Sequence, residues 1–164
     1  MNFRSDNVTG VAPEILAALA AANAGSAPSY GEDAITKRLA QRFAALFEHE
    51  VAVFPVATGT AANALALATL VPPWGVVYCH EAAHIQVDEC GAPEFFAGGA
   101  KLMPLPGADA KLQPEVVEQA IAGQGVVHHA QPAAMSISEA TEAGTLYRPE
   151  EVAALGALAR RHRL

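Results

Sequence analysis

Apolar positions along the chain repeat with two different spacings, and these spacings predict helices and strands in alternation. Stripes with a period near 3.6 residues indicate amphipathic helices, and short β-branched runs such as 51–56 and 76–79 indicate buried strands. The predicted helices cover 13–23, 33–47, 60–71, 84–90, 113–122 and 149–162, and the predicted strands cover 51–56, 76–79, 101–105 and 133–138. The alternation predicts an α/β fold with three layers, in which a mostly parallel sheet lies between helices.

Composition narrows the class of protein. Of the 164 residues, 52% are hydrophobic and 16% are charged, which favours a globular chain with a large buried fraction. The net charge of −7 disfavours a nucleic-acid-binding face, and the apolar helical stretches are too short to span a membrane. Residues 1–6 lack the apolar core of a signal peptide, so we expect a cytoplasmic protein with two reduced cysteines.

The turn Thr58-Gly59-Thr60 is the first candidate for chemistry. It joins a predicted strand to an alanine- and leucine-rich predicted helix. Backbone N–H groups at a helix start have no partner within the helix, and the helix dipole favours negative charge there. The turn is therefore a candidate phosphate site, although many strand–turn–helix joints carry glycine and threonine only to make the turn.

The segment from His80 to His84 matches the H-E-x-x-H pattern of zinc hydrolases. On a helix, this spacing would place both imidazoles on one face, with Glu81 as general base. However, 76–79 is predicted to be a strand, which leaves His80 outside any helix, and no third ligand follows at the usual spacing. We expect no metal site here and keep a zinc hydrolase as the third alternative.

Five segments carry a family likeness, in the order in which they occur: 3–7 (FRSDN), 29–33 (SYGED), 57–63 (ATGTAAN), 83–91 (AHIQVDECG) and 139–145 (EATEAGT). Together they resemble the threonine aldolase and aromatic amino acid β-eliminating lyase family, whose members use pyridoxal 5′-phosphate (PLP). The resemblance implies the large domain of a PLP-dependent transferase of fold type I, of which residues 1–164 would be an incomplete, N-terminal part. It also implies a lyase that cleaves a β-hydroxy-α-amino acid to glycine and an aldehyde.

The resemblance assigns roles to individual residues. Gly59 and Thr60 would bind the phosphate of PLP, with Thr58 beside them. His84 would stack on the pyridine ring and serve as the catalytic residue, because an imidazole can cover an aromatic face and accept a proton near neutral pH.

Two further residues match positions that concern the substrate. Ser5 would contact the amino-acid substrate, and Tyr30 would reach the active site of a neighbouring subunit, so that a homo-oligomer is expected. A structural role remains open for both, as a helix cap at Ser5 and as a loop anchor at Tyr30.

The resemblance also implies parts that these 164 residues do not contain. In the family, the Schiff-base lysine and the aspartate that pairs with the pyridine nitrogen lie beyond the segment matching 149–162. Lys37, Lys101 and Lys111 fall where the family has no catalytic lysine. We therefore expect a truncated chain that is inactive alone, marginally stable and prone to associate. The alternative is a non-catalytic chain that pairs with a full-length homologue.

Overall fold

The computed structural model describes residues 8–164, and the chain divides into two compact units, Met1–Pro55 and Val56–Leu164. The first unit contains helices α1 (Pro13–Ala22) and α2 (Ala34–Phe47), close to the predicted ranges. Asp33 caps α2: its Oδ1 accepts hydrogen bonds from the backbone N–H groups of Ile35 and Thr36, both at 2.9 Å. A hydrogen bond from the Thr36 hydroxyl is the main cause that lowers the pKa of Asp33.

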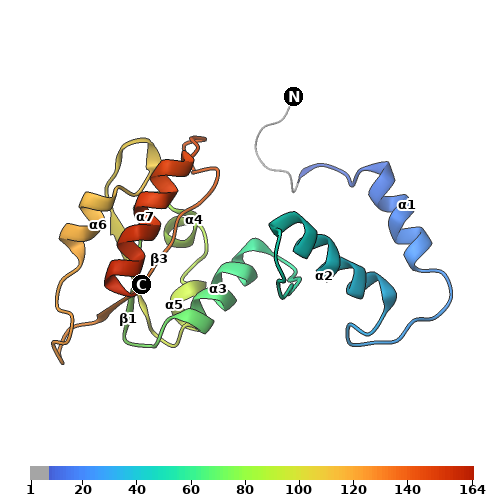
Figure 1. The fold of residues 1–164 in the computed structure, drawn as a ribbon, viewed down its shortest axis with the longest axis horizontal. Helices are drawn as coiled ribbons and strands as arrows, with labels where there is room; N and C mark the ends of the chain where they lie inside the picture. Colours follow the sequence, from blue (N-terminus) through green and yellow to red (C-terminus); the bar gives the residue numbers. More distant parts are fainter. Residues whose placement is uncertain (1–7) are drawn as a thin grey trace. The chain divides into compact units, whose positions relative to one another are not determined.

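The second unit is built on three parallel strands in the order β2-β1-β3 (Figure 1). These are β1 (Gly75–His80), β2 (Lys101–Leu105) and β3 (Gln131–Met135). The helices are α3 (Gly59–Leu70), α4 (His84–Val87), α5 (Ala92–Phe96), α6 (Pro114–Ala120) and α7 (Pro149–His162), with a 3₁₀ turn at Ala108–Ala110. The predicted α/β fold and parallel pairing are confirmed.

Alternate residues of β1 face two different cores. Val77 and Cys79 belong to a cluster with Leu67 of α3, whereas Val76 and Tyr78 belong to a cluster on the side of α6 and α7. All six residues of β1 are buried, as expected for a central strand covered on both faces. The sheet therefore lies between two helical layers. One layer contains α3 packed against α5, and the other contains α6 packed against α7 (Figure 1).

The prediction of a strand at 51–56 is wrong, since no residue of this segment has strand structure. A strand needs a hydrogen-bonded neighbour, and β1, β2 and β3 form the only sheet found between residues 8 and 164. The β-branched composition of the segment indicates an extended chain, but composition does not supply the pairing partner.

Smaller differences have local causes. The predicted helix 84–90 ends at Val87, because Asp88, with φ −127° and ψ 16°, leaves the helical conformation, and Gly91, with φ 74°, then leads the chain into α5. Strand β3 starts two residues before the predicted 133–138, and its pairing with β1 shifts register between Val76 and Val77. No helix within the described part of the chain has the length and apolar character needed to cross a bilayer.

Candidate functional site

Helix α3 begins with two unpaired backbone donors. Thr58 is its N-cap, and the Thr58 Oγ1 accepts a hydrogen bond from the Ala61 N–H at 3.1 Å. The next N–H, that of Ala62, binds the Thr58 carbonyl at 3.1 Å. Within residues 8–164, the N–H groups of Gly59 and Thr60 have no acceptor. An anion at this end of the 12-residue helix would satisfy both donors and interact favourably with the dipole.

The space next to these donors is open. A Cβ atom added at Gly59 would meet no heavy atom within 4 Å, and Gly59 itself is exposed. The Thr60 side chain is half-buried, and its hydroxyl has no hydrogen-bond partner in the described structure. Two amides and one hydroxyl can therefore donate to one group that binds at this turn, which suits a phosphate ester.

His84 is connected to α3 through a shared carboxylate oxygen. It follows the carboxyl end of β1 and opens α4, and its side chain is 47% exposed. The His84 Nδ1 lies 2.9 Å from the Oε1 of Glu89, and the Nδ2 of Asn63 donates to the same oxygen at 2.7 Å. Since Asn63 lies in the first turn and a half of α3, these contacts link the imidazole to the end of the helix that begins at the Thr58-Gly59-Thr60 turn.

The other histidine of the H-E-x-x-H pattern has a different environment. His80 is the last residue of β1 and is buried. Its Nδ1 accepts a hydrogen bond from the Ala82 N–H at 3.0 Å, and its Nε2 lies 3.0 Å from the Gly107 carbonyl oxygen. Both ring nitrogens are therefore engaged, and the helix that would place His80 and His84 on one face does not form.

The segment 139–145 forms a loop closed by its own polar side chains. The hydroxyls of Thr141 and Thr145 lie 2.7 Å apart, and Thr145 also donates to the Asp109 carbonyl at 2.6 Å. A carboxylate oxygen of Glu139 accepts from the Tyr147 N–H at 3.0 Å. These contacts give Glu139, Thr141 and Thr145 a structural function in shaping the loop.

Two of the lysines can be placed relative to the sheet of the second unit. Lys101 begins β2 and pairs with Val76 near the start of β1. It therefore lies at the amino ends of the parallel strands, whereas His84 follows the carboxyl end of β1. The Lys111 ammonium binds Glu151 at 3.1 Å and lies 5.5 Å from the centre of the Tyr147 ring. Neither lysine contacts the residues of the Thr58–His84 site.

The structure does not test the two predicted substrate contacts. Ser5 lies outside the described residues, and Tyr30 belongs to the first unit, where its side chain is fully exposed. Both roles stay predictions. Sequence reasoning assigned no role to Asn63 or Glu89, although the available signal was that both lie in the segments 57–63 and 83–91, which carry the family likeness.

Comparison with known proteins shows the family to which the chain is related. The model of the β-eliminating lyase family matches residues 2–164. Low-specificity L-threonine aldolases of Pseudomonas sp. (strain NCIMB 10558) and Pseudomonas aeruginosa are each 43% identical over 155 residues, covering 94% of this chain and 45% of the relative. A threonine aldolase structure from Leishmania major aligns with a TM-score of 0.88 and 30% identity, covering 96% of this chain and 46% of that one.

The chain thus spans a little under half the length of these relatives. The match extends over nearly all of its residues and includes both the α3 turn and the His84 segment. The fold, the ordered motifs and these similarities agree, and the chain belongs to the β-eliminating lyase family.

Proposed function

We propose that this chain forms part of a PLP-dependent, threonine aldolase-like lyase, in which the second unit binds the cofactor. The relatives named threonine aldolases support the reaction class. The substrate class would be β-hydroxy-α-amino acids, cleaved to glycine and an aldehyde. The observation that carries the proposal is the Glu89 oxygen shared by Asn63 and His84, because it joins the imidazole to the helix whose first amides are free.

The phosphate-binding role belongs to Gly59 and Thr60. Their N–H groups lie at a helix start and have no acceptor among the residues that the structure describes, and the Thr60 hydroxyl adds a third donor. Hydrogen bonds to a charged acceptor contribute more than neutral ones, so each donor matters for affinity. Thr58 contributes chiefly by capping the helix and so orienting its neighbours, because its Oγ1 is already occupied by the Ala61 N–H.

His84 has the position and the free nitrogen needed for the catalytic role. Its Nδ1 is engaged by Glu89, whereas its Nε2 has no partner in the part of the chain that the structure describes. PLP, when bound, withdraws electrons from the bond to be broken. The imidazole would lie against the cofactor ring and accept the proton of the substrate hydroxyl at Nε2.

Two further features of the proposal come from the family alone. Ser5 would contact the substrate, and Tyr30 would act in a neighbouring subunit of a homo-oligomer. A cytoplasmic location is also proposed, and it is supported by the two cysteines, which form no disulfide. Lys101 lies at the opposite end of the strands from His84, and the Lys111 ammonium is paired with Glu151, so we propose that neither forms the covalent link to PLP. The family resemblance places that lysine outside these 164 residues, and we propose that they do not complete the reaction alone.

The phosphate site can be tested by titrating the ¹⁵N-labelled chain with PLP and, separately, with inorganic phosphate. We expect both to shift the amide resonances of Gly59 and Thr60, and PLP alone to shift His84. Thr60→Ala should weaken PLP binding by roughly tenfold, the effect of losing one charge-assisted hydrogen bond.

The matched control is Thr69→Ala, at the other end of the same helix. The Thr69 hydroxyl donates to the Leu65 carbonyl at 2.8 Å, and its loss should leave the affinity unchanged. Equal weakening by both substitutions, or PLP-induced shifts that avoid Gly59 and Thr60, would overturn the proposed site.

A further inference from the structure

The carboxylate of Glu89 is buried where α3, α4 and α5 meet. The Glu89 side chain has no exposed surface. Its Oε1 accepts from Asn63 and contacts His84 Nδ1, while its Oε2 is buried and has no hydrogen-bond partner among the described residues. Burying a carboxylate is costly unless it is paired, so the two contacts at Oε1 must offset much of that cost.

The contacts at Oε1 determine which ring nitrogen carries hydrogen. The Oε1 of Glu89 already accepts a hydrogen bond from Asn63, and a carboxylate oxygen that carries no hydrogen can only accept, so the His84 nitrogen at 2.9 Å is the donor. In the neutral imidazole, Nδ1 then holds the proton and Nε2 keeps its lone pair. Asn63 holds the carboxylate oxygen in place from α3, since its Nδ2 donates at 2.7 Å.

His80 provides a contrast within the same short segment. The Ala82 N–H donates to His80 Nδ1, so this nitrogen is the acceptor and the hydrogen lies on Nε2, where it can bind the Gly107 carbonyl. The two histidines are therefore held in opposite tautomers. The difference arises from one neighbour in each case, a backbone N–H at His80 and a carboxylate at His84.

We propose that Glu89, held by Asn63, is a positioning residue that fixes His84 in the Nδ1–H tautomer and so presents a bare Nε2 to the site. The tautomer follows from the contacts of Glu89, whereas the use of Nε2 as proton acceptor rests on the proposed function. Glu89 would act only through His84, because its own side chain is closed off from the site opening.

The tautomers can be measured by long-range ¹H–¹⁵N correlation of the imidazole rings, with the pH raised until the spectra no longer change, so that the neutral rings are observed. In the unmodified chain, we expect His84 to show a protonated Nδ1 and His80 a protonated Nε2. A protonated Nε2 on His84 in the unmodified chain would overturn the proposal without any variant.

Two substitutions sharpen the test. Glu89→Leu removes the acceptor, so the Nδ1–H form of His84 should fall from the dominant to the minor species, while His80 stays unchanged and reports a folded chain. Glu89→Gln should retain the Nδ1–H form, since the amide oxygen can face both donors at Asn63 and His84. Persistence of the Nδ1–H form in Glu89→Leu would contradict the positioning role.

The result can be separated from that of the PLP titration. If PLP fails to bind but His84 responds to Glu89→Leu as expected, the tautomer assignment stands and the proposed function fails. If PLP binds as proposed but the tautomer of His84 does not change in Glu89→Leu, the positioning role of Glu89 is contradicted and the cofactor site stands.

Discussion

Thr58 and Thr60 flank the same glycine, yet their hydroxyl groups have different surroundings. The Thr58 Oγ1 accepts the Ala61 N–H, whereas the Thr60 hydroxyl has no partner in residues 8–164. The first residue therefore contributes to helix stability before any ligand binds, and the second is free to bind one. Sequence inspection alone treats the two threonines as equivalent because it shows only residue type and spacing.

We expect Thr58→Ala to lower the free energy of unfolding by about 1 kcal/mol, the usual contribution of an N-cap hydroxyl. Thr58→Ser should retain most of the stability, because serine supplies the same acceptor. Urea unfolding followed by circular dichroism measures both. Thr60→Ala is the matched control and should leave the midpoint nearly unchanged; an equal loss in Thr60→Ala would show that its hydroxyl also has a structural role.

At the scale of elements, helices with clear chemical boundaries were predicted best. Helix α7 was predicted over the range observed, Pro149–His162, because proline and two glutamates favour a first turn and basic residues favour a last one. The prediction of a strand at 51–56 was wrong because a strand is defined by a hydrogen-bonded neighbour, which the local sequence does not show. The link from Asn63 to Glu89 and His84 also depends on residues 26 and 5 positions apart, and only the folded chain brings them together.

The start of α7 also carries a pH-dependent contact. The carboxylate of Glu151 accepts from the Arg148 N–H at 2.6 Å and from the Lys111 ammonium at 3.1 Å. These hydrogen bonds, the backbone one first, lower the pKa of Glu151 from 4.5 to about 2. Because the folded pKa lies below the unfolded one, the charged carboxylate stabilises the fold above pH 4.5, and this contribution is lost as the pH falls toward 2.

Glu151→Gln should therefore lower Tm at neutral pH, and the difference from the unmodified chain should shrink on acidification through this range. Thermal melts recorded by circular dichroism at several pH values measure the difference. Glu150→Gln is the control, since the Glu150 side chain is 67% exposed and approaches only the Arg148 side chain, at 3.4 Å. A difference that stays constant from neutral pH to below the folded pKa would contradict the linkage.

At the scale of the whole molecule, burial is confined to the second unit. The cores on the two faces of the sheet lie within residues 56–164, whereas no residue from 8 to 55 is buried. In α1, the side chains of Ile15, Leu16 and Leu19 are each more than half exposed. Composition predicted a large buried fraction for the chain as a whole, but it could not show that the two units differ in how much of their apolar surface is buried.

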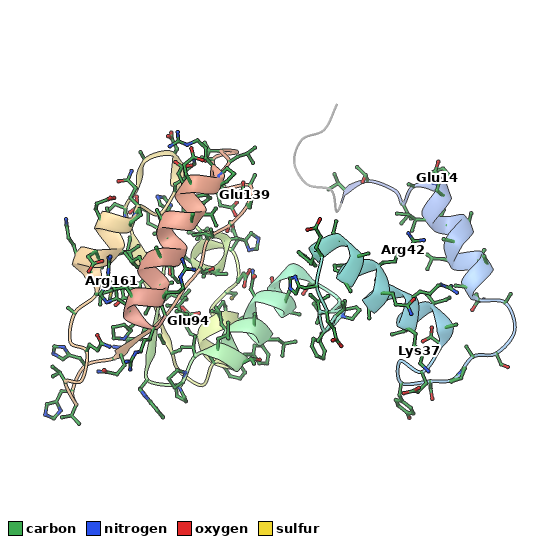
Figure 2. The ribbon with its side chains drawn as sticks, viewed as in Figure 1. Glu14, Lys37, Arg42, Glu94, Glu139 and Arg161 are labelled. Atoms are coloured by element: carbon green, nitrogen blue, oxygen red, sulfur yellow. The ribbon has the colours of Figure 1, made fainter. Side chains whose placement is uncertain are left out.

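This difference predicts where a protease cuts first. Trypsin should cleave after Lys37, Arg38 or Arg42, which lie on α2 in the unit without a buried core (Figure 2). Lys101 should be cut later, because it is hydrogen-bonded into the sheet as the first residue of β2. Arg148 is followed by Pro149, a bond that trypsin cleaves poorly, and trimming near Arg161 and Arg163 would shorten only the end of α7. Mass spectrometry of early time points identifies the sites.

The dependence of the trypsin cleavage rate on protein concentration tests whether the chain associates. If the exposed apolar side chains of α1 and α2 are covered by association, as the family resemblance led us to expect, cleavage within α2 should slow as the concentration rises. Burial of apolar surface would protect those helices by reducing local unfolding, on which cleavage of a helix depends. A concentration-independent rate would show that these helices stay open to solvent. Early cleavage at Lys101 or Lys111 would instead show that the sheet is not the stable part of the chain.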